Sequence, residues 1–176
     1  TVVKDLAGNK LAANYTWTFT TSAPPPPPPS EGPGGPILVI TDATYLSNPF
    51  GRYYSEILRA EGFNAFLVAD ISTVSASTLS AYDVVLLSEM TLNATQISML
   101  DTWVSSGGNL IAFRPSKTLT ALYGLTDATT TTSEGYLAVN TGTSIGLGVF
   151  GEPMQFPGPA DHYTLKDGAT SLATLY

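Results

Sequence analysis

Four short apolar runs constrain the fold of this chain more than any other feature of its sequence. They are Ile37–Ile40, Ala65–Val68, Val84–Leu87 and Leu110–Phe113. Continuous apolar runs of this length are typical of parallel strands that are buried on both faces of a sheet. Polar residues follow the runs, so we expect polar side chains to gather where the carboxyl ends of the strands meet.

Helical patterns of apolar residues separate these runs. The expected apolar face of the first helix consists of Phe50, Tyr53, Tyr54, Ile57 and Leu58, with Gly62 as the stop. A short helical turn is expected over Ser75–Ala81. The next helix has Asn93 and Gln96 as a capping box, an apolar face of Ile97, Leu100, Trp103 and Val104, and an end at Gly107-Gly108. A last helix is expected to begin at Ser116 as N-cap, to bury Leu119, Leu122 and Tyr123, and to end at Gly124.

Strands that alternate with helices predict an α/β fold with right-handed crossovers. We expect a flavodoxin-like, doubly wound parallel sheet in the order 2-1-3-4, with the strands numbered along the chain. Beyond Leu125 the helical period ends and a β-rich C-terminal annex is expected, with Thr129–Thr132 as a polar loop. Its expected strands are Tyr136–Val139, Ile145–Phe150, Met154–Phe156 and Ser171–Tyr176. The expected domain covers residues 37–176, with a core at 37–125 and an annex at 126–176 that is cut before its natural end.

Residues 1–22 have β-type chemistry. Tyr15, Trp17 and Phe19 alternate with threonines, which predicts a half-buried strand whose sheet partner comes from upstream sequence or from the next domain. The segment Val3–Leu11 followed by Tyr15–Thr21 resembles the closing part of a bacterial Ig-like domain of surface proteins. Residues 23–36 are expected to be a linker, because the six prolines Pro24–Pro29 form a stiff spacer of about 20 Å.

The composition excludes several classes of function. A net charge of −7 gives no basic surface for nucleic acid. The absence of cysteine excludes disulfides, thiol catalysis and thiolate metal sites. No apolar run is long enough to span a membrane. With only 12% charged residues and many threonines and serines, the chain is expected to be extracellular or at the surface of a bacterial cell.

The polar residues that follow the strands form the candidate site. In a sheet of order 2-1-3-4, ligands bind where the carboxyl ends of the first and third strands flank a crevice. This places Asp42, Glu89 and Arg114 near one another. The three side chains form either a pocket for a small ligand or cation, or an ion pair in which Arg114 neutralises one or both acids. We favour the ion pair, since networks of paired charges imitate functional sites.

Aromatic residues after the first strand supply a second hypothesis. Tyr45, Phe50, Tyr53 and Tyr54 are either a platform on which a sugar stacks or part of the core. The candidate ligand-binding residues are therefore Asp42, Tyr45, Glu89, Arg114 and Ser116. No cofactor is expected. The single histidine, His162, lies in a proline-bounded segment that we expect to be a loop, and one histidine cannot form a zinc site. Calcium binding through carboxylates alone stays open.

Three segments resemble the class I glutamine amidotransferase-like fold, in particular its branch without amidotransferase activity that includes ThuA-like domains. They are ILVITDAT at 37–44, DVVLLSE at 83–89 and WVSSGGNLIAF at 103–113. In the catalytic branch a cysteine follows the last of these strands and a His-x-Glu pair completes the triad. The resemblance places Arg114 or its neighbour at the cysteine position, and Tyr163-Thr164 follow His162, so amidotransferase activity is not expected.

These observations predict a non-catalytic structural or ligand-binding module of a multidomain extracellular protein, with carbohydrate as the hypothetical ligand. One alternative is a hydrolase that uses Ser116 with His162, or groups outside this chain; Ser116 has no Gly-x-Ser-x-Gly elbow and is explained as a helix N-cap. Another is a surface or filament subunit that assembles through the N-terminal strand. The expected partners are neighbouring domains, a glycan or another copy of the chain; nucleic acid is not expected as a partner, and no membrane span is expected.

Overall fold

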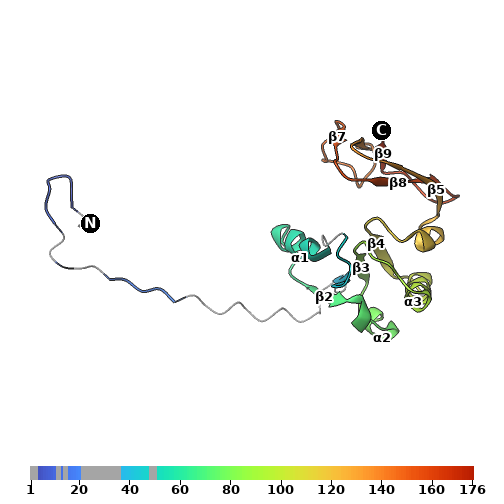
Figure 1. Ribbon diagram of the computed structural model, residues 1–176, viewed down its shortest axis with the longest axis horizontal. Helices are drawn as coiled ribbons and strands as arrows, with labels where there is room; N and C mark the ends of the chain where they lie inside the picture. The colour runs from blue at the N-terminus through green and yellow to red at the C-terminus, as the bar shows by residue number, and fades with distance from the viewer. Residues whose placement is uncertain (1–3, 11–12, 14–15, 21–36, 48–50) are drawn as a thin grey trace.

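The computed structural model describes residues 4–10, 13, 16–20, 37–47 and 51–176 of the 176-residue chain. The proposed linker at 23–36, together with Tyr15 and Phe50, lies outside the described residues. Two folded parts follow one another along the chain, an α/β part from Ile37 to Gly124 and a C-terminal β region from Leu125 to Tyr176 (Figure 1).

Four parallel strands form the centre of the α/β part. They are β1 (Ile37–Thr41), β2 (Phe66–Asp70), β3 (Val84–Leu87) and β4 (Asn109–Ala112), and they lie in the order β2-β1-β3-β4. The connecting helices are α1 (Gly51–Ala60), η1 (Ile71–Thr73), α2 (Ala76–Leu79), α3 (Ala94–Ser105) and η2 (Lys117–Tyr123). All four predicted strands therefore form, and the predicted α/β class with a parallel sheet is confirmed.

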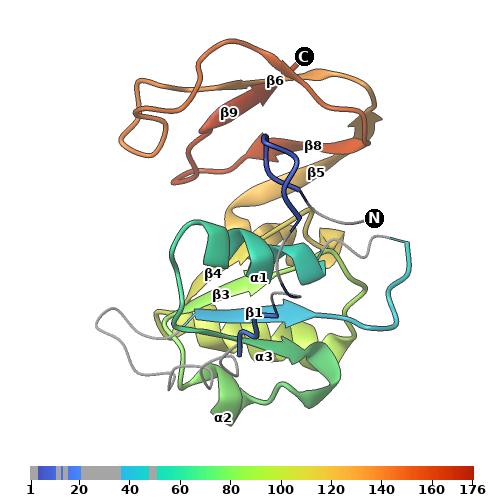
Figure 2. The same cartoon turned by 90° about the vertical axis from the view of Figure 1, so that its left-hand side faces the viewer.

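The core lies on one face of this sheet. Leu38 and Ile40 of β1 pair in register with Val85 and Leu87 of β3, so these four side chains share a face. That face packs against α2 and α3, where Leu79 and Leu100 are fully buried, and α1 covers the opposite face (Figure 2). A fully buried leucine contributes about 1.5–3 kcal/mol through apolar surface removed from water. In the central strand β1, Leu38, Val39 and Ile40 are fully buried, so both faces of this strand exclude water as expected. The outer strands are less buried than the sequence predicts, since Leu67 of β2 and Ile111 of β4 are 46% and 51% exposed.

The ends of α3 follow from its local sequence. Asn93 accepts a hydrogen bond from the Gln96 backbone N–H at 2.9 Å, and the Gln96 side chain accepts one from the Asn93 N–H at 2.9 Å, which confirms the predicted capping box. The helix ends before Gly107, whose positive φ of 105° favours glycine. None of the described helices is long and apolar enough to cross a membrane.

The segment after Ser116 differs from the prediction. It is a 3-10 helix that ends at Gly124 as expected, but Ser116 makes no capping hydrogen bond to its backbone. The Ser116 hydroxyl instead lies 2.8 Å from the Thr118 hydroxyl. The Ser116 side chain therefore has a neighbouring hydroxyl as its partner in place of a backbone N–H of the helix.

Helix α1 also differs, because its expected apolar face is only partly buried. Ile57 is 55% exposed and Tyr53 is 38% exposed, whereas the buried residues of the helix are Gly51 and Ser55. The helix therefore approaches the sheet through small side chains, which bring its backbone close to the strands.

Two small antiparallel sheets form the C-terminal β region. β5 (Leu125–Thr132) pairs with β8 (Ala160–Leu165), and β6 (Tyr136–Val139) lies between β7 (Met154–Gln155) and β9 (Ala173–Leu175). Strand β6 is predicted in full, and β7 and β9 lie within their predicted segments. The expected loop at Thr129–Thr132 is instead part of β5, because Thr131 and Thr132 pair with Asp161 and Ala160 of β8. The register shifts between Asp127 and Thr131, where Thr129 has a φ of 61°.

The remaining differences in this region have equally local causes. Ile145–Phe150 forms turns in place of the expected strand, and Ile145 and Leu147 are 70% and 79% exposed. Gly146 and Gly148 interrupt that apolar run, and Gly148 has a φ of 84°. Strand β8 forms where the sequence predicted the loop around His162.

The N-terminal residues do not form the predicted half-buried strand. Lys4 and Lys10 form an isolated bridge around a turn at Gly8, but Thr16–Thr20 has no strand structure. Trp17 and Phe19 are 68% and 72% exposed. The reason is that no strand among the described residues pairs with this segment, and an unpaired strand has no face to bury.

Candidate functional site

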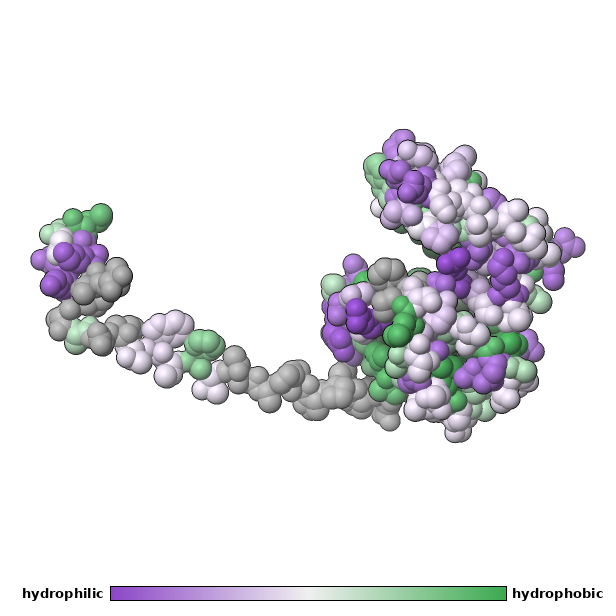
Figure 3. All heavy atoms as spheres, viewed as in Figure 1, coloured by the Kyte–Doolittle hydropathy of each residue, from purple (hydrophilic) through white to green (hydrophobic). Residues whose placement is uncertain are grey.

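The carboxyl ends of the strands bring polar residues to one edge of the sheet. Because β1, β3 and β4 are parallel and in register, the residues that follow them lie side by side. Asp42 follows β1, Glu89 follows β3, and Arg114 follows β4. Hydrophilic residues are visible in Figure 3 where this edge of the α/β part meets the C-terminal β region.

Arg114 is held by two carboxylates. Its Nε donates to Asp161 Oδ2 at 2.9 Å, and its Nη1 donates to Glu89 Oε1 at 3.3 Å. The side chain of Arg114 is 37% exposed, whereas those of Glu89 and Asp161 are 16% and 7% exposed. The pKa of the Arg114 guanidinium is raised overall, first by its hydrogen bond to Asp161. Burial of the guanidinium lowers this pKa, and the negative charges of Asp161 and Glu89 raise it further. The favoured prediction of an ion pair between Arg114 and Glu89 is confirmed.

Of the two acids that Arg114 was expected to pair with, one or both, Asp42 is not a partner. Its carboxylate accepts hydrogen bonds from the N–H and the hydroxyl of Thr44, at 2.8 and 2.6 Å. An aspartate that bonds the backbone two residues ahead forms a local turn, so the oxygen of Asp42 is used within its own loop. The second carboxylate on Arg114 is that of Asp161 in β8, a residue that was not predicted because its segment was expected to be a loop. The β-type run Tyr163-Thr164-Leu165 is the signal that could have revealed the strand.

Aromatic side chains lie beside this ion pair. Tyr45 donates its hydroxyl to Glu89 Oε1 at 3.2 Å, and the rings of Tyr54 and Phe113 stack with a centroid distance of 4.0 Å. Burial, followed by the charge of Glu89, raises the pKa of both tyrosines. The hydroxyl of Tyr45 therefore stays protonated and serves as a donor.

Together these residues line an open hollow of about 590 Å³, which we call the aromatic hollow. It is lined by Tyr45, Ser47, Tyr54, Glu89, Phe113, Arg114, Gly158 and Pro159. Tyr45 and Glu89 also line an adjoining hollow of about 300 Å³ that includes Asp42 and Arg52. Three of the five predicted ligand-binding residues, Tyr45, Glu89 and Arg114, thus line the aromatic hollow, and Asp42 lines its neighbour.

Ser116 is not part of this arrangement. It lines neither hollow, and its hydroxyl is bonded to Thr118. His162 is held inside the C-terminal β region, with Nδ1 3.1 Å from the Thr130 hydroxyl and Nε2 2.7 Å from the Thr132 hydroxyl. Within the described part of the chain, no hydrogen bond joins Ser116 to His162. A serine nucleophile needs such a base to activate it.

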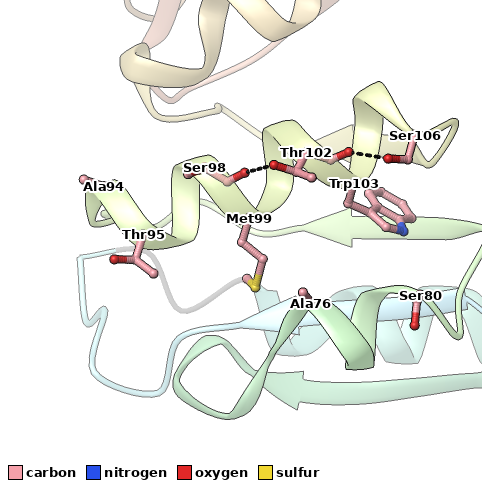
Figure 4. Close-up of a pocket in the computed structure, with 9 residues that line it drawn as sticks. All are labelled: Ala76, Ser80, Ala94, Thr95, Ser98, Met99, Thr102, Trp103 and Ser106. Atoms are coloured by element: carbon pink, nitrogen blue, oxygen red, sulfur yellow. Dashed lines mark hydrogen bonds between the residues drawn. The ribbon is translucent and has the colours of Figure 1, made fainter.

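A larger hollow, of about 670 Å³, lies between α2 and α3 (Figure 4). No charged side chain lines it. The hydroxyls of Thr102 and Ser106 donate to carbonyl groups of their own helix, at 2.8 Å each. Ligand sites combine apolar surface with polar groups that converge on the ligand. The hollow between α2 and α3 is larger, but the aromatic hollow fits this description of a ligand site better.

Comparison with known proteins adds no assignment to this geometry. No protein-family model matches the chain, and no curated protein matches its sequence. Among the described residues, no group of three or more histidine, aspartate or glutamate side chains is placed to hold a metal ion.

Proposed function

We propose that this chain belongs to a multidomain extracellular bacterial protein and that its α/β part is a non-catalytic module that binds carbohydrate. Residues 1–22 are the end of an Ig-like domain and residues 23–36 are a linker in this proposal. Residues 37–176 form an amidotransferase-like domain with a flavodoxin-like sheet and a β-rich annex. The three sequence segments that resemble that family support the proposal, and so does the strand order β2-β1-β3-β4.

The aromatic hollow is the observation that carries the binding role. Sugars present apolar C–H faces that stack on aromatic rings, and hydroxyls that need hydrogen-bonding partners at the rim. The stacked pair Tyr54 and Phe113 supplies the apolar surface, with Phe113 36% exposed. Glu89 and Arg114 supply polar groups in the same hollow.

The ion pairs of Arg114 support the structural side of the role. The guanidinium joins Glu89 of the α/β part to Asp161 of the C-terminal β region. It occupies the place after β4 where the resembling enzymes carry a nucleophile, and a paired guanidinium cannot attack a substrate. We therefore expect that the unmodified chain does not hydrolyse bound glycans. The variant Ser116→Ala should bind glycans as tightly as the unmodified chain. If the unmodified chain has hydrolase activity and Ser116→Ala loses it, the alternative function of a serine hydrolase is supported.

Replacement of Phe113 by alanine should weaken glycan binding about tenfold. The variant loses one ring of the stacked pair, and a tenfold change corresponds to about 1.4 kcal/mol, within the range for loss of an aromatic contact. A glycan array identifies the ligand, and isothermal titration calorimetry measures the affinity. Phe63→Ala is the matched control, because Phe63 is 53% exposed and does not line the hollow. The proposal fails if no glycan binds, or if both variants weaken binding equally.

Self-assembly is a second candidate function, favoured by the exposed N-terminal aromatics. Trp17 and Phe19 stack at a centroid distance of 5.4 Å while both are mostly exposed. Large exposed apolar groups that lie together mark surfaces for a partner. If the partner is a second copy, light scattering should show a mass that rises with concentration, and the double variant Trp17→Ser, Phe19→Ser should stay monomeric. A monomeric mass for the unmodified chain at every concentration excludes this candidate.

A further inference from the structure

An excess of negative charge surrounds Arg114 at the aromatic hollow. Among the described lining residues, Glu89 and Arg114 carry one charge of each sign, and Asp161, which pairs with Arg114 from outside the lining, adds a second carboxylate. One guanidinium between two carboxylates leaves one negative charge in excess. A ligand that enters the hollow therefore meets a local charge of the same sign as the net charge of the chain, −7.

The negative charge of Glu89 affects two tyrosines of the hollow. After burial, the charge of Glu89 contributes to the raised pKa of Tyr45 and of Tyr54. Arg114 lowers the pKa of Tyr45, but more weakly than Glu89 raises it. Both tyrosines therefore lie close enough to the Glu89 carboxylate to be affected by its negative charge, and the Tyr45 hydroxyl is bonded to it.

Aromatic rings favour a cation for a separate reason. The face of an aromatic ring is electron-rich and attracts an ammonium group within about 6 Å of its centroid. Tyr45, Tyr54 and Phe113 all line the same hollow. An aromatic surface next to excess negative charge is the combination by which proteins recognise organic ammonium groups.

The adjoining hollow extends this lining. It shares Tyr45 and Glu89 with the aromatic hollow and adds the carboxylate of Asp42. Its cation, Arg52, donates a hydrogen bond to the Tyr53 hydroxyl at 3.0 Å, and its guanidinium lies 4.9 Å from the centre of the Tyr53 ring. An oligosaccharide that spans both hollows would pass Glu89 at their junction and Asp42 beyond it.

From this geometry we infer that the aromatic hollow binds an amino sugar with a protonated amine in preference to a neutral or an acidic sugar. The inference rests on the proposed carbohydrate-binding function and narrows its ligand class. A neutral sugar has only the stacking and hydrogen-bonding contacts. An acidic sugar is repelled by the carboxylates.

The test compares three trisaccharides by isothermal titration calorimetry with the full chain. They are a trimer of glucosamine, its N-acetylated form and a trimer of galacturonate, each titrated at mildly acidic pH, where the amine is protonated. We expect the glucosamine trimer to bind about fivefold to tenfold more tightly than its N-acetylated form, and the galacturonate trimer to bind most weakly. This preference should shrink in high salt, because salt screens charge interactions.

Two variants locate the source of the preference. Glu89→Gln keeps the shape of the side chain and removes its charge, so that the charges of Arg114 and Asp161 cancel. In this variant the glucosamine trimer should bind no more tightly than the N-acetylated trimer. Asp101→Asn removes the same charge from the exposed face of α3 and should leave the preference unchanged. Circular dichroism checks that both variants are folded.

The outcomes separate this inference from the proposed function. If the N-acetylated trimer binds as tightly as the glucosamine trimer, or more tightly, the amine preference is overturned while carbohydrate binding stands. If Glu89→Gln and Asp101→Asn reduce the preference equally, overall charge is responsible and the assignment to the hollow is overturned. If none of the three sugars binds while the glycan array shows another ligand, the amine preference is overturned and carbohydrate binding stands; if the array also shows no ligand, the carbohydrate function itself is overturned.

Discussion

Replacement of Arg114 by alanine should lower the free energy of unfolding by about 2–3 kcal/mol. The change leaves the carboxylates of Glu89 and Asp161 without their shared cation, and their side chains are only 16% and 7% exposed. Loss of one partner from a buried pair costs more, about 3–5 kcal/mol, but Arg114 is 37% exposed and water screens part of the interaction. Urea unfolding followed by circular dichroism measures the change.

The consequence should extend beyond stability, because Arg114 joins the two folded parts. Limited proteolysis of Arg114→Ala should cleave the C-terminal β region faster than in the unmodified chain. Lys117→Ala is the control. Lys117 forms a more exposed pair with Asp127, and its loss should lower the free energy of unfolding much less than the loss of Arg114. An equal loss of stability in both variants would show that the two carboxylates do not depend on Arg114.

The backbone of Arg114 allows a second check on the same residue. Its φ of 44° lies in the left-handed region, which costs a residue with a side chain about 1–2 kcal/mol relative to glycine. Glycine also gives the unfolded chain more freedom, which offsets about 0.4–1 kcal/mol of that advantage. Arg114→Gly should therefore be about 0.5–1 kcal/mol more stable than Arg114→Ala, although both lack the guanidinium. A less stable glycine variant would contradict the strained backbone.

Replacement of Gly51 by alanine should lower the free energy of unfolding by about 1–3 kcal/mol, because the added methyl group overpacks the contact between Gly51 and Ser88. An added Cβ would lie 2.6 Å from the Cβ of Ser88 and 2.7 Å from its hydroxyl. Ser88 cannot easily move, since it is 5% exposed and both its N–H and its hydroxyl donate to the carbonyl of Ile40. The measurement is again the free energy of unfolding in urea.

A double variant isolates this contact. Ser88→Gly removes the obstructing atoms, so Gly51→Ala should cost less in a chain that already carries Ser88→Gly than in the unmodified chain. Gly158→Ala is the matched control, because nothing lies within 4 Å of its added Cβ, and its stability should be unchanged or slightly raised. An undiminished cost in the double variant would place the clash elsewhere.

The candidate site was only partly predictable from sequence. The position of Arg114 and Glu89 after adjacent strands follows from the parallel arrangement, and their ion pair was the favoured expectation. Asp42 was expected near them on the same grounds, as a candidate second acid of the pair, and it lines the adjoining hollow while its carboxylate bonds Thr44. The threonine-rich segment at β5 was predicted as a loop because composition alone does not reveal the partner strand β8.

The amino-acid sequence by itself determined the features that depend on neighbouring residues. These are the four apolar strands, the capping box of Asn93 and Gln96, and the stop at Gly124. Each arises from local periodicity or from a backbone conformation that few residue types adopt. Only the tertiary structure decided that Asp161 reaches Arg114 across 47 positions of sequence and that Phe113 stacks on Tyr54. Such contacts depend on how whole layers pack, because a side chain takes the partner that the packed backbone brings within reach.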